Sequence, residues 1–239
     1  MGGQIHLENG DCLSVMNDIP DKSIDMILCD LPYGTTRNKW DSAINLEELW
    51  KQYIRIIKDN GCIALFAQTP FDKVLGYSNL KMLKYEWIWQ KENGTGFLNA
   101  KKMPLKIHEN ILIFYKKSPV YNPQMRKGFK AYKCKQGSGS SSWNYNRECG
   151  GYITENNGER YPIDVLNYSR ENGLHPTQKP VTLLEYFIKT YTNENDIVLD
   201  NCMGSGSTGV AAKNINRRFI GIELDKHYFD IAEKRIQNV

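Results

Sequence analysis

The chain lacks any uninterrupted apolar stretch near the roughly 20 residues that a membrane-spanning helix needs. Its first four residues lead directly into a strand-like segment, so we expect no signal peptide and a cytosolic location. No CxxC spacing relates the six cysteines, and no pair of histidines lies near two of them. We therefore expect reduced packing thiols and no metal site.

A strong charge of one sign is also absent, because the formal net charge is only +4. The distribution is uneven: residues 101–135 hold ten Lys/Arg and the single acid Glu109, which gives this segment +9 and the rest of the chain −5. The same segment contains the aromatic residues Tyr115, Tyr121, Phe129 and Tyr132. Basic charge beside aromatic rings suits a polyanion, although charge alone leaves a plain solvated face as the alternative.

At 239 residues and 41% hydrophobic content, the chain is long enough to bury the core of one α/β domain. Apolar runs predict strands at 5–7, 24–29, 62–66, 85–89, 111–115, 197–199 and 219–222. Helical spacing predicts helices from residue 13, at 46–57, after Pro70, at 181–190, at 208–214 and up to 236. Asn60-Gly61 is expected to end the helix at 46–57. Strands that alternate with helices predict a mostly parallel sheet with helices on both faces.

Residues 116–172 lack this regularity and contain the Gly/Ser tract at 137–142. We interpret residues 118–172 as an inserted recognition region within a single domain of residues 1–239. Regular α/β patterning returns only after this region.

Four acids follow predicted strands: Asp11, Asp30, Asp200 and Glu223. Open α/β sheets bind their ligands beyond the carboxyl ends of the strands, so these positions are where a site would be built.

A glycine-containing turn, residues 200–206, connects one of these strands to a helix. Gly204 and Gly206 allow the backbone to approach a ligand closely, and the helix presents N–H groups to a carboxylate or phosphate. Glu223 lies 23 residues after Asp200, near the roughly 20-residue offset at which an acid binds a ribose hydroxyl pair. The pattern favours a nucleoside-containing cofactor, although each feature taken singly also fits a structural turn and a surface acid.

The run Asp30-Leu31-Pro32-Tyr33 follows the apolar strand at 24–29. An exocyclic amine on a nucleobase is a poor nucleophile because its lone pair is delocalised into the ring. The Asp30 carboxylate and a following backbone carbonyl are able to accept hydrogen bonds from such an amine as it reacts. Tyr33 offers a ring on which an extruded base stacks. A structural Pro-Tyr turn is the alternative, which a nearby nucleoside site makes less plausible.

Together these motifs resemble the amino-methylating DNA methyltransferases that use S-adenosylmethionine, in the beta arrangement with the catalytic motif first. The resemblance covers most of the chain outside the central region. It rests on Gly10-Asp11-Cys12, Asp30-Leu31-Pro32-Tyr33-Gly34, His175-Pro176-Thr177-Gln178-Lys179-Pro180 and Asp200 through Gly206. It implies the Rossmann-like fold of this family, S-adenosylmethionine as cofactor, and duplex DNA from which the target base is flipped. Residues 118–172 then become a target-recognition region.

The resemblance also implies roles for individual residues. Asp30 and the Leu31 carbonyl hold the amine, Pro32 stiffens the turn, and Tyr33 stacks on the base. The implied cofactor-binding residues are Asp11 and Cys12 at the adenine, His175 and Thr177 near the methionine end, Asp200, Cys202, Gly204, Ser205 and Gly206 in the turn, and Glu223 at the ribose.

Two positions depart from the family pattern. Leu31 stands where a first proline is usual, which matters little because a backbone carbonyl carries the role at this position. Asn201-Cys202 stands where Pro-Phe is usual, so an aromatic side chain expected near the cofactor is replaced.

An aspartate-led catalytic motif resembles the enzymes that methylate the 6-amino group of adenine, with the 4-amino group of cytosine as the nearest alternative. A DNA-binding protein without activity and a methyltransferase of RNA or of a small molecule are further alternatives. The segment Asn93-Gly94-Thr95-Gly96-Phe97 forms either a loop against the target base or a plain hairpin turn. Family members often pair, which suggests a homodimer, while a cognate restriction enzyme stays unidentified.

Overall fold

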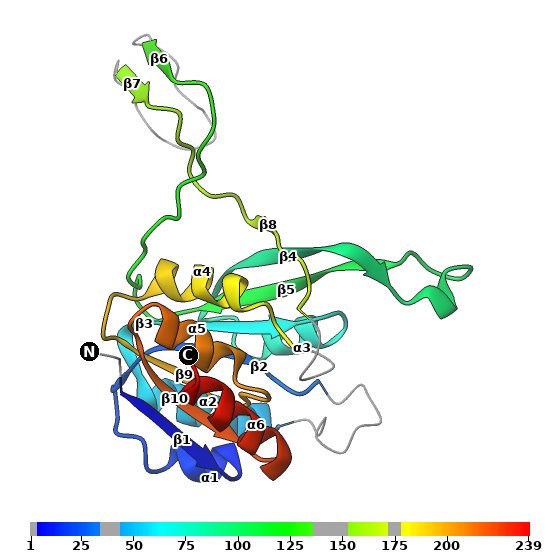
Figure 1. The fold of residues 1–239 in the computed structure, drawn as a ribbon, viewed down its shortest axis with the longest axis vertical. Coiled ribbons are helices and arrows are strands. Elements are labelled where there is room, and N and C mark those ends of the chain that lie inside the picture. Colours follow the sequence, from blue (N-terminus) through cyan, green and yellow to red (C-terminus); the bar gives the residue numbers. More distant parts are fainter. Residues whose placement is uncertain (1–3, 34–43, 136–152, 172–177) are drawn as a thin grey trace. The chain divides into compact units, whose positions relative to one another are not determined.

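The computed structural model describes residues 4–33, 44–135, 153–171 and 178–239. Among them, one eight-stranded sheet has the order β1-β10-β9-β2-β3-β5-β4-β8 (Figure 1). In that order, its strands are β1 (Ile5–Asn9), β10 (Arg218–Glu223), β9 (Ile197–Asp200), β2 (Ile24–Asp30), β3 (Ile57–Ala67), β5 (Lys106–Phe114), β4 (Leu83–Thr95) and β8 (Val165–Asn167). Only β5 runs antiparallel to its neighbours, so the predicted mostly parallel α/β sheet is confirmed.

Helices cover both faces of this sheet. One face packs against α1 (Cys12–Met16), α2 (Leu46–Ile56) and α3 (Phe71–Ser78), and the other against α4 (Val181–Tyr191), α5 (Ser207–Asn214) and α6 (Lys226–Gln237). Strand β2 shows why: Met26 and Leu28 are buried in one cluster, and Ile27 and Cys29 in the other. A strand apolar on both faces is typical of a parallel sheet between helical layers.

The junction of α2 and β3 differs from the prediction. The strand begins at Ile57, directly after the helix, so Gly61 lies inside β3 and does not separate the two elements. The pairing of β2 with β3 shifts register here, with Ile57 opposite Ile24 and Cys62 opposite Met26. A Cβ at position 61 would lie 2.7 Å from the Ile57 side chain. The glycine therefore permits a β-bulge inside β3. From sequence alone, Asn60-Gly61 predicts a turn between the helix and the strand.

Strands β4 and β5 form an antiparallel hairpin. Trp87 and Trp89 on β4 are buried at 4% and 2% exposure, so both rings belong to the core. At Asn93–Phe97, β4 extends to Thr95, and Gly96 takes a φ of 93° before the short 3-10 helix η1 (Phe97–Asn99). This segment therefore belongs to the hairpin, and its place against the target base stays a prediction.

Residues 123–163 form a second compact unit, which lies inside the predicted region 118–172. Its strands β6 (Tyr132–Lys135) and β7 (Ile153–Asn156) pair in antiparallel fashion. The Arg160 guanidinium lies 5.3 Å from the centre of the Phe129 ring and 4.8 Å from that of Tyr132. Strands this short carry too few residues for a visible alternation, which is why they were not predicted.

Within the described ranges, no helix is both long enough and apolar enough to span a bilayer.

Candidate active site

The predicted motifs lie at the carboxyl ends of four neighbouring parallel strands. Asp11 and Cys12 follow β1, Glu223 ends β10, the turn 200–206 follows β9, and Asp30 ends β2. These strands occupy successive positions in the sheet, although their residues come from both ends of the chain. The fold therefore brings the two sets of motifs to one edge.

Glu223 connects β10 to both neighbouring segments. Its Oε2 accepts a hydrogen bond from the Gly204 N–H at 2.8 Å, and its Oε1 accepts one from the Asp225 N–H at 2.9 Å. Its backbone carbonyl accepts a bond from the Gly10 N–H at 3.0 Å. Burial raises the pKa of Glu223 above its usual value. A carboxylate has about four acceptor positions, so two backbone donors leave capacity for a hydroxyl pair.

Asp11 begins helix α1. Its Oδ1 accepts hydrogen bonds from the backbone N–H and the hydroxyl of Ser14, both at 2.9 Å. This is an N-cap contact, and it fixes the backbone immediately before Cys12, which is buried.

Asp200 organises the turn that follows β9. Its Oδ2 accepts from the Thr208 hydroxyl at 2.6 Å and its Oδ1 from the Cys202 N–H at 3.1 Å. Gly204 and Gly206 have φ angles of 51° and 79°, in the left-handed region that favours glycine. Ser205 between them is buried.

We expect Gly206→Ala to lower the free energy of unfolding by about 2–4 kcal/mol, combining left-handed strain with overpacking. A Cβ at position 206 would lie 2.9 Å from the Cβ of Ala232 on α6. Gly204→Ala is the matched control, because open space surrounds it and only the conformational cost of about 1–2 kcal/mol applies. Urea unfolding measures both. Equal losses would show that contact with α6 does not constrain the turn.

A second expectation concerns Asp200, whose pKa is raised to about 6, chiefly by burial. Between about pH 3.9, the pKa of an unfolded Asp, and about pH 6, Asp200 is protonated in the native state and ionised in the unfolded state. The contribution of Asp200 to the free energy of unfolding therefore falls as the pH rises through this range. Asp200→Asn should therefore raise the free energy of unfolding at pH 7 by about 1–3 kcal/mol. The gain should shrink at pH 5, and a gain equal at both pH values would contradict the argument.

Three thiols lie around this turn. Cys12, Cys29 and Cys202 are free, and interaction with Cys202 is the main cause that lowers the pKa of Cys12. Burial raises the pKa of Cys29 to about 12. Cys62 is likewise free of a disulfide bond.

Asp30 lies at the end of β2 with both carboxylate oxygens engaged. Its Oδ1 accepts a hydrogen bond from the Tyr33 hydroxyl at 2.7 Å, and its Oδ2 pairs with the Lys179 ammonium. The Tyr33 ring stacks on Phe71 with centroids 5.1 Å apart. Leu31 is buried at 3% exposure, so its side chain belongs to the core.

Lys179 joins Asp30 to a second buried acid. Its ammonium lies 3.4 Å from Glu109 Oε2, and Glu109 Oε1 pairs with Lys91. Burial works to lower the pKa of Lys179, but Asp30 and Glu109 outweigh it and hold that pKa above its usual value. Burial likewise works to raise the pKa of Glu109, and the two lysines outweigh it and lower that pKa. Two carboxylates and two ammonium groups thus balance in charge.

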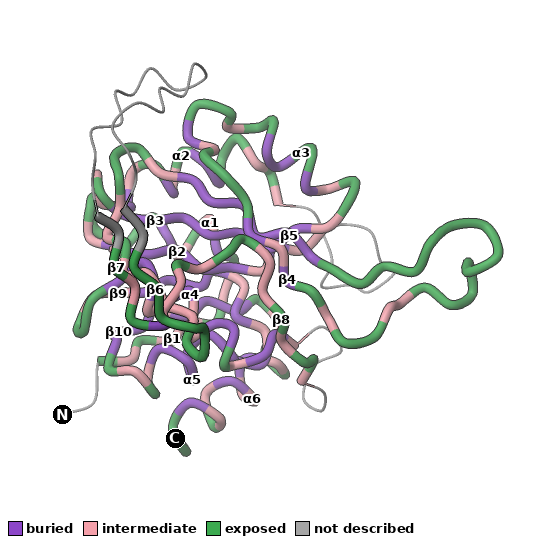
Figure 2. The backbone as a smooth tube through the Cα atoms, turned by 90° about the horizontal axis from the view of Figure 1, so that it is seen from above, coloured by how far each residue is buried: buried purple, intermediate pink, exposed green. Residues whose placement is uncertain are grey.

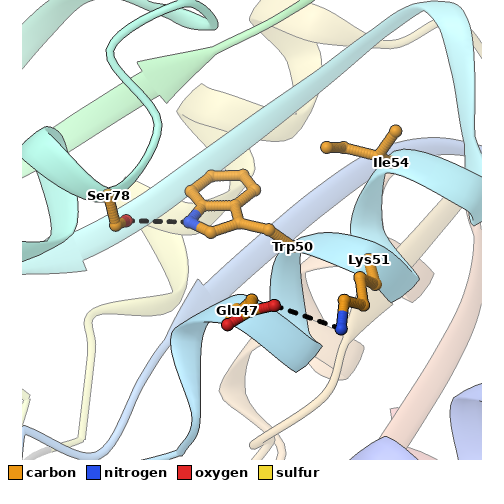
Figure 3. Close-up of a pocket in the computed structure, with 5 residues that line it drawn as sticks. All are labelled: Glu47, Trp50, Lys51, Ile54 and Ser78. Carbon is orange, nitrogen blue, oxygen red and sulfur yellow. Dashed lines mark hydrogen bonds and ion pairs between the residues drawn. The ribbon is translucent and has the colours of Figure 1, made fainter.

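His175 and Thr177 fall outside the described residues. Within the described ranges, no group of His, Cys, Asp and Glu side chains is arranged to hold a metal ion. A pocket of about 540 Å³ lies by α2 and α3, lined by Glu47, Trp50, Lys51, Ile54 and Ser78 (Figure 3). None of these is a predicted site residue, and the Trp50 indole N–H donates to Ser78 Oγ at 2.8 Å.

Comparison with known proteins shows the family to which the chain belongs. A family model described as DNA methylase matches residues 24–234. The chain belongs to this DNA methylase family. It is 32% identical to the type II methyltransferase M.BglII of Bacillus subtilis over 94% of the chain, and spans 66% of that relative's length. It is 29% identical to the DNA adenine methyltransferase YhdJ of Escherichia coli (strain K12), covering 95% of the chain and 81% of the relative.

A solved structure, the M1.HpyAVI–SAM complex, matches this DNA methylase with a TM-score of 0.68 and 28% identity, covering 97% of this chain and all of that one. The predicted family and its Rossmann-like fold are thereby confirmed.

The DNA methylase site contains three residues to which no role was assigned from sequence: Lys91, Glu109 and Lys179. Lys179 lies in the motif 175–180, and Glu109 is the single acid of the basic segment. An isolated acid in a basic, strand-forming stretch is a signal for a buried ion pair, but its partner becomes visible only when β5 pairs with β4.

Proposed function

We propose that the chain transfers a methyl group from S-adenosylmethionine to the 6-amino group of an adenine that is flipped out of duplex DNA. One observation carries the proposal: a site suited to a nucleoside and an acid suited to an amine lie at adjacent strand ends, on β9 and β10 and on β2. Family membership supplies the reaction class.

The residues present fit the cofactor. When bound, S-adenosylmethionine supplies an electrophilic methyl group on a sulfonium ion. Glu223 retains acceptor capacity for the ribose hydroxyls, and Asp11 with Cys12 line the adenine side. A Cβ at Gly204 would meet open space, so the turn offers its backbone at this position to the methionine portion. Asp200 acts by fixing this turn.

Asp30 holds the target amine. The amine takes the place of the Tyr33 hydroxyl at Oδ1, while Lys179 keeps Oδ2 in position. The Leu31 carbonyl accepts a hydrogen bond from the second amino N–H, Pro32 stiffens the turn, and the Tyr33 ring then stacks on the base. With S-adenosylmethionine bound, the amino nitrogen held by Asp30 would accept the methyl group that the cofactor supplies. The nitrogen would then release one proton to solvent. The carboxylate stabilises the positive charge that develops on this nitrogen.

Adenine is favoured because Asp30 leads the catalytic motif and because a relative matched over 95% of the chain is named a DNA adenine methyltransferase. The 4-amino group of cytosine is the alternative substrate. A protein without activity is disfavoured, since Asp30, Tyr33 and Glu223 are all present and positioned at one edge of the sheet.

Duplex DNA is the proposed partner, with residues 118–172 as the target-recognition region. A cytosolic location, a homodimer and a cognate restriction enzyme stay predictions.

The test is transfer of a tritiated methyl group from S-adenosylmethionine to unmethylated duplex DNA, followed by digestion to nucleosides. Label in 6-methyladenine is the expected result. Label in 4-methylcytosine would correct the base. Absence of label together with tight DNA binding would favour the protein without activity. Competition by RNA and by free nucleoside tests the remaining substrates.

A further inference from the structure

The β4–β5 hairpin extends past the edge of the sheet at which Asp30 lies. Asp30 is in register with Phe66, Phe66 with Ile111, and Ile111 with Trp87. Beyond this level the hairpin continues to the pairing of Thr95 with Lys106. Ile111 and Lys106 are five residue steps apart along β5, which at about 3.3 Å per step is about 16 Å. The tip therefore projects beyond the proposed active site on the same side (Figure 1).

This tip is exposed although much of it is apolar. Every residue from 96 to 108 is exposed, as Figure 2 shows for the end of the hairpin. Phe97 is 70% exposed, Leu98 102% and Met103 54%. These side chains contribute little to the core, and exposed apolar groups gathered on a projecting element indicate a surface for a partner.

The charge of the tip indicates which partner. Lys101, Lys102 and Lys106 lie between residues 93 and 108, and no acid does. All three are exposed, and the Lys106 ammonium donates a hydrogen bond to the Thr69 carbonyl at 3.2 Å. Three ammonium groups beside apolar side chains suit a polyanion that also offers apolar edges. Two copies of the chain joined tip to tip would instead bring six ammonium groups together, which disfavours self-association here.

We propose that the tip of the β4–β5 hairpin enters the major groove of the DNA duplex that presents the target base. The proposal rests on the proposed function. The major groove is about 12 Å wide and admits a two-stranded β-ribbon. Lys101 and Lys102 contact phosphates, and Phe97 and Leu98 contact base edges such as the methyl group of thymine. The hairpin is then a second DNA-reading element, outside residues 118–172.

The salt dependence of DNA binding tests the lysines. Binding of labelled, unmethylated plasmid DNA is measured by filter retention between about 50 and 200 mM salt. Lys101→Ala/Lys102→Ala should reduce the slope of log affinity against log salt by about 2, because each phosphate contact contributes about 0.9. The matched control is Lys81→Ala/Lys84→Ala, which removes two exposed lysines at the opposite end of β4 and should leave the slope unchanged.

Leu98→Ser tests the apolar contact. Affinity should fall roughly 10-fold with the slope unchanged, because a base contact and no phosphate contact is lost. Tyr77→Ser is the control, since Tyr77 is 78% exposed on α3, and it should bind like the wild type. Urea unfolding of all variants should match the wild type, because the altered side chains are exposed.

Wild-type affinity and slope in both tip variants would overturn the inference. So would a Leu98→Ser protein whose only change is its oligomeric state in light scattering. Methyl transfer by the wild-type protein separates the two proposals. If the wild type transfers methyl groups and the tip variants bind DNA like the wild type, only the proposed role of the hairpin is refuted. If DNA binding depends on the tip but the wild type transfers no methyl group, only the proposed enzymatic function is refuted.

Discussion

Asp30→Ala is expected to lower the rate of methyl transfer about 1000-fold, while S-adenosylmethionine still binds. Removing one group that stabilises charge in a transition state typically costs about 10²–10³-fold in rate, and the proposed mechanism has the Asp30 carboxylate against the reacting nitrogen. Single-turnover transfer of tritiated methyl to duplex DNA measures the rate, and calorimetry measures cofactor binding. Loss of cofactor binding to the same extent would instead assign Asp30 to the cofactor site.

Asp25→Ala provides the matched control for this variant. Asp25 lies at the other end of β2, and its Oδ1 pairs with the Lys58 ammonium at 2.6 Å. Both substitutions therefore remove an aspartate with a lysine partner from the same strand. Only the change at Asp30 should affect the transfer rate in the folded protein. Full activity in Asp30→Ala would refute the proposed mechanism, since the amine would have lost its main acceptor.

Lys179→Met is expected to have the second largest effect, in both stability and rate. It leaves Asp30 and Glu109 without the ammonium group between them, and breaking a buried ion pair by removing one partner costs about 3–5 kcal/mol. We expect the free energy of unfolding to fall by about 3 kcal/mol. The transfer rate should fall about 100-fold, because Asp30 Oδ2 is no longer held.

A second substitution separates these two effects. In Lys179→Met/Glu109→Gln the more buried carboxylate is neutral, so about 2 kcal/mol of stability should return, while methyl transfer stays low. Lys179→Arg retains the charge and should restore part of the rate. Lys58→Met, which unpairs Asp25, is the control for loss of an Asp–Lys pair. If the double variant recovers activity along with stability, Lys179 has a structural role only.

The sequence predicts the sheet and its helices because the buried strands are continuous apolar runs. The strands at 24–29 and 197–199 are buried on both faces and are therefore rich in apolar residues, a pattern that is visible in the sequence. The start of β3 could not be predicted in the same way. A glycine at position 61 is compatible both with the end of a helix and with a bulge in a strand. Only the close approach of Gly61 to the Ile57 side chain in the structure shows that it forms a bulge.

The site was predictable to the extent that its residues follow strands. Asp11, Asp30 and Glu223 each follow an apolar run, and parallel strands end at one edge. The ion pairs of Lys179 with Asp30 and Glu109 were not predictable. Glu109 and Lys179 come from distant segments, and in the sequence each looks like an ordinary surface charge. The contact of Tyr33 with Phe71 and Asp30 is likewise a matter of side-chain direction, which spacing does not determine.

The position of β10 has a consequence for synthesis of the protein. This strand lies between β1 and β9, so β1 gains its neighbour in the sheet only once residues 218–223 have been translated. Asp30 therefore leaves the ribosome long before Glu223. A growing chain thus carries the acid proposed to hold the amine before it has the acid proposed to bind the ribose, and a chain truncated before residue 218 has an unpaired β1.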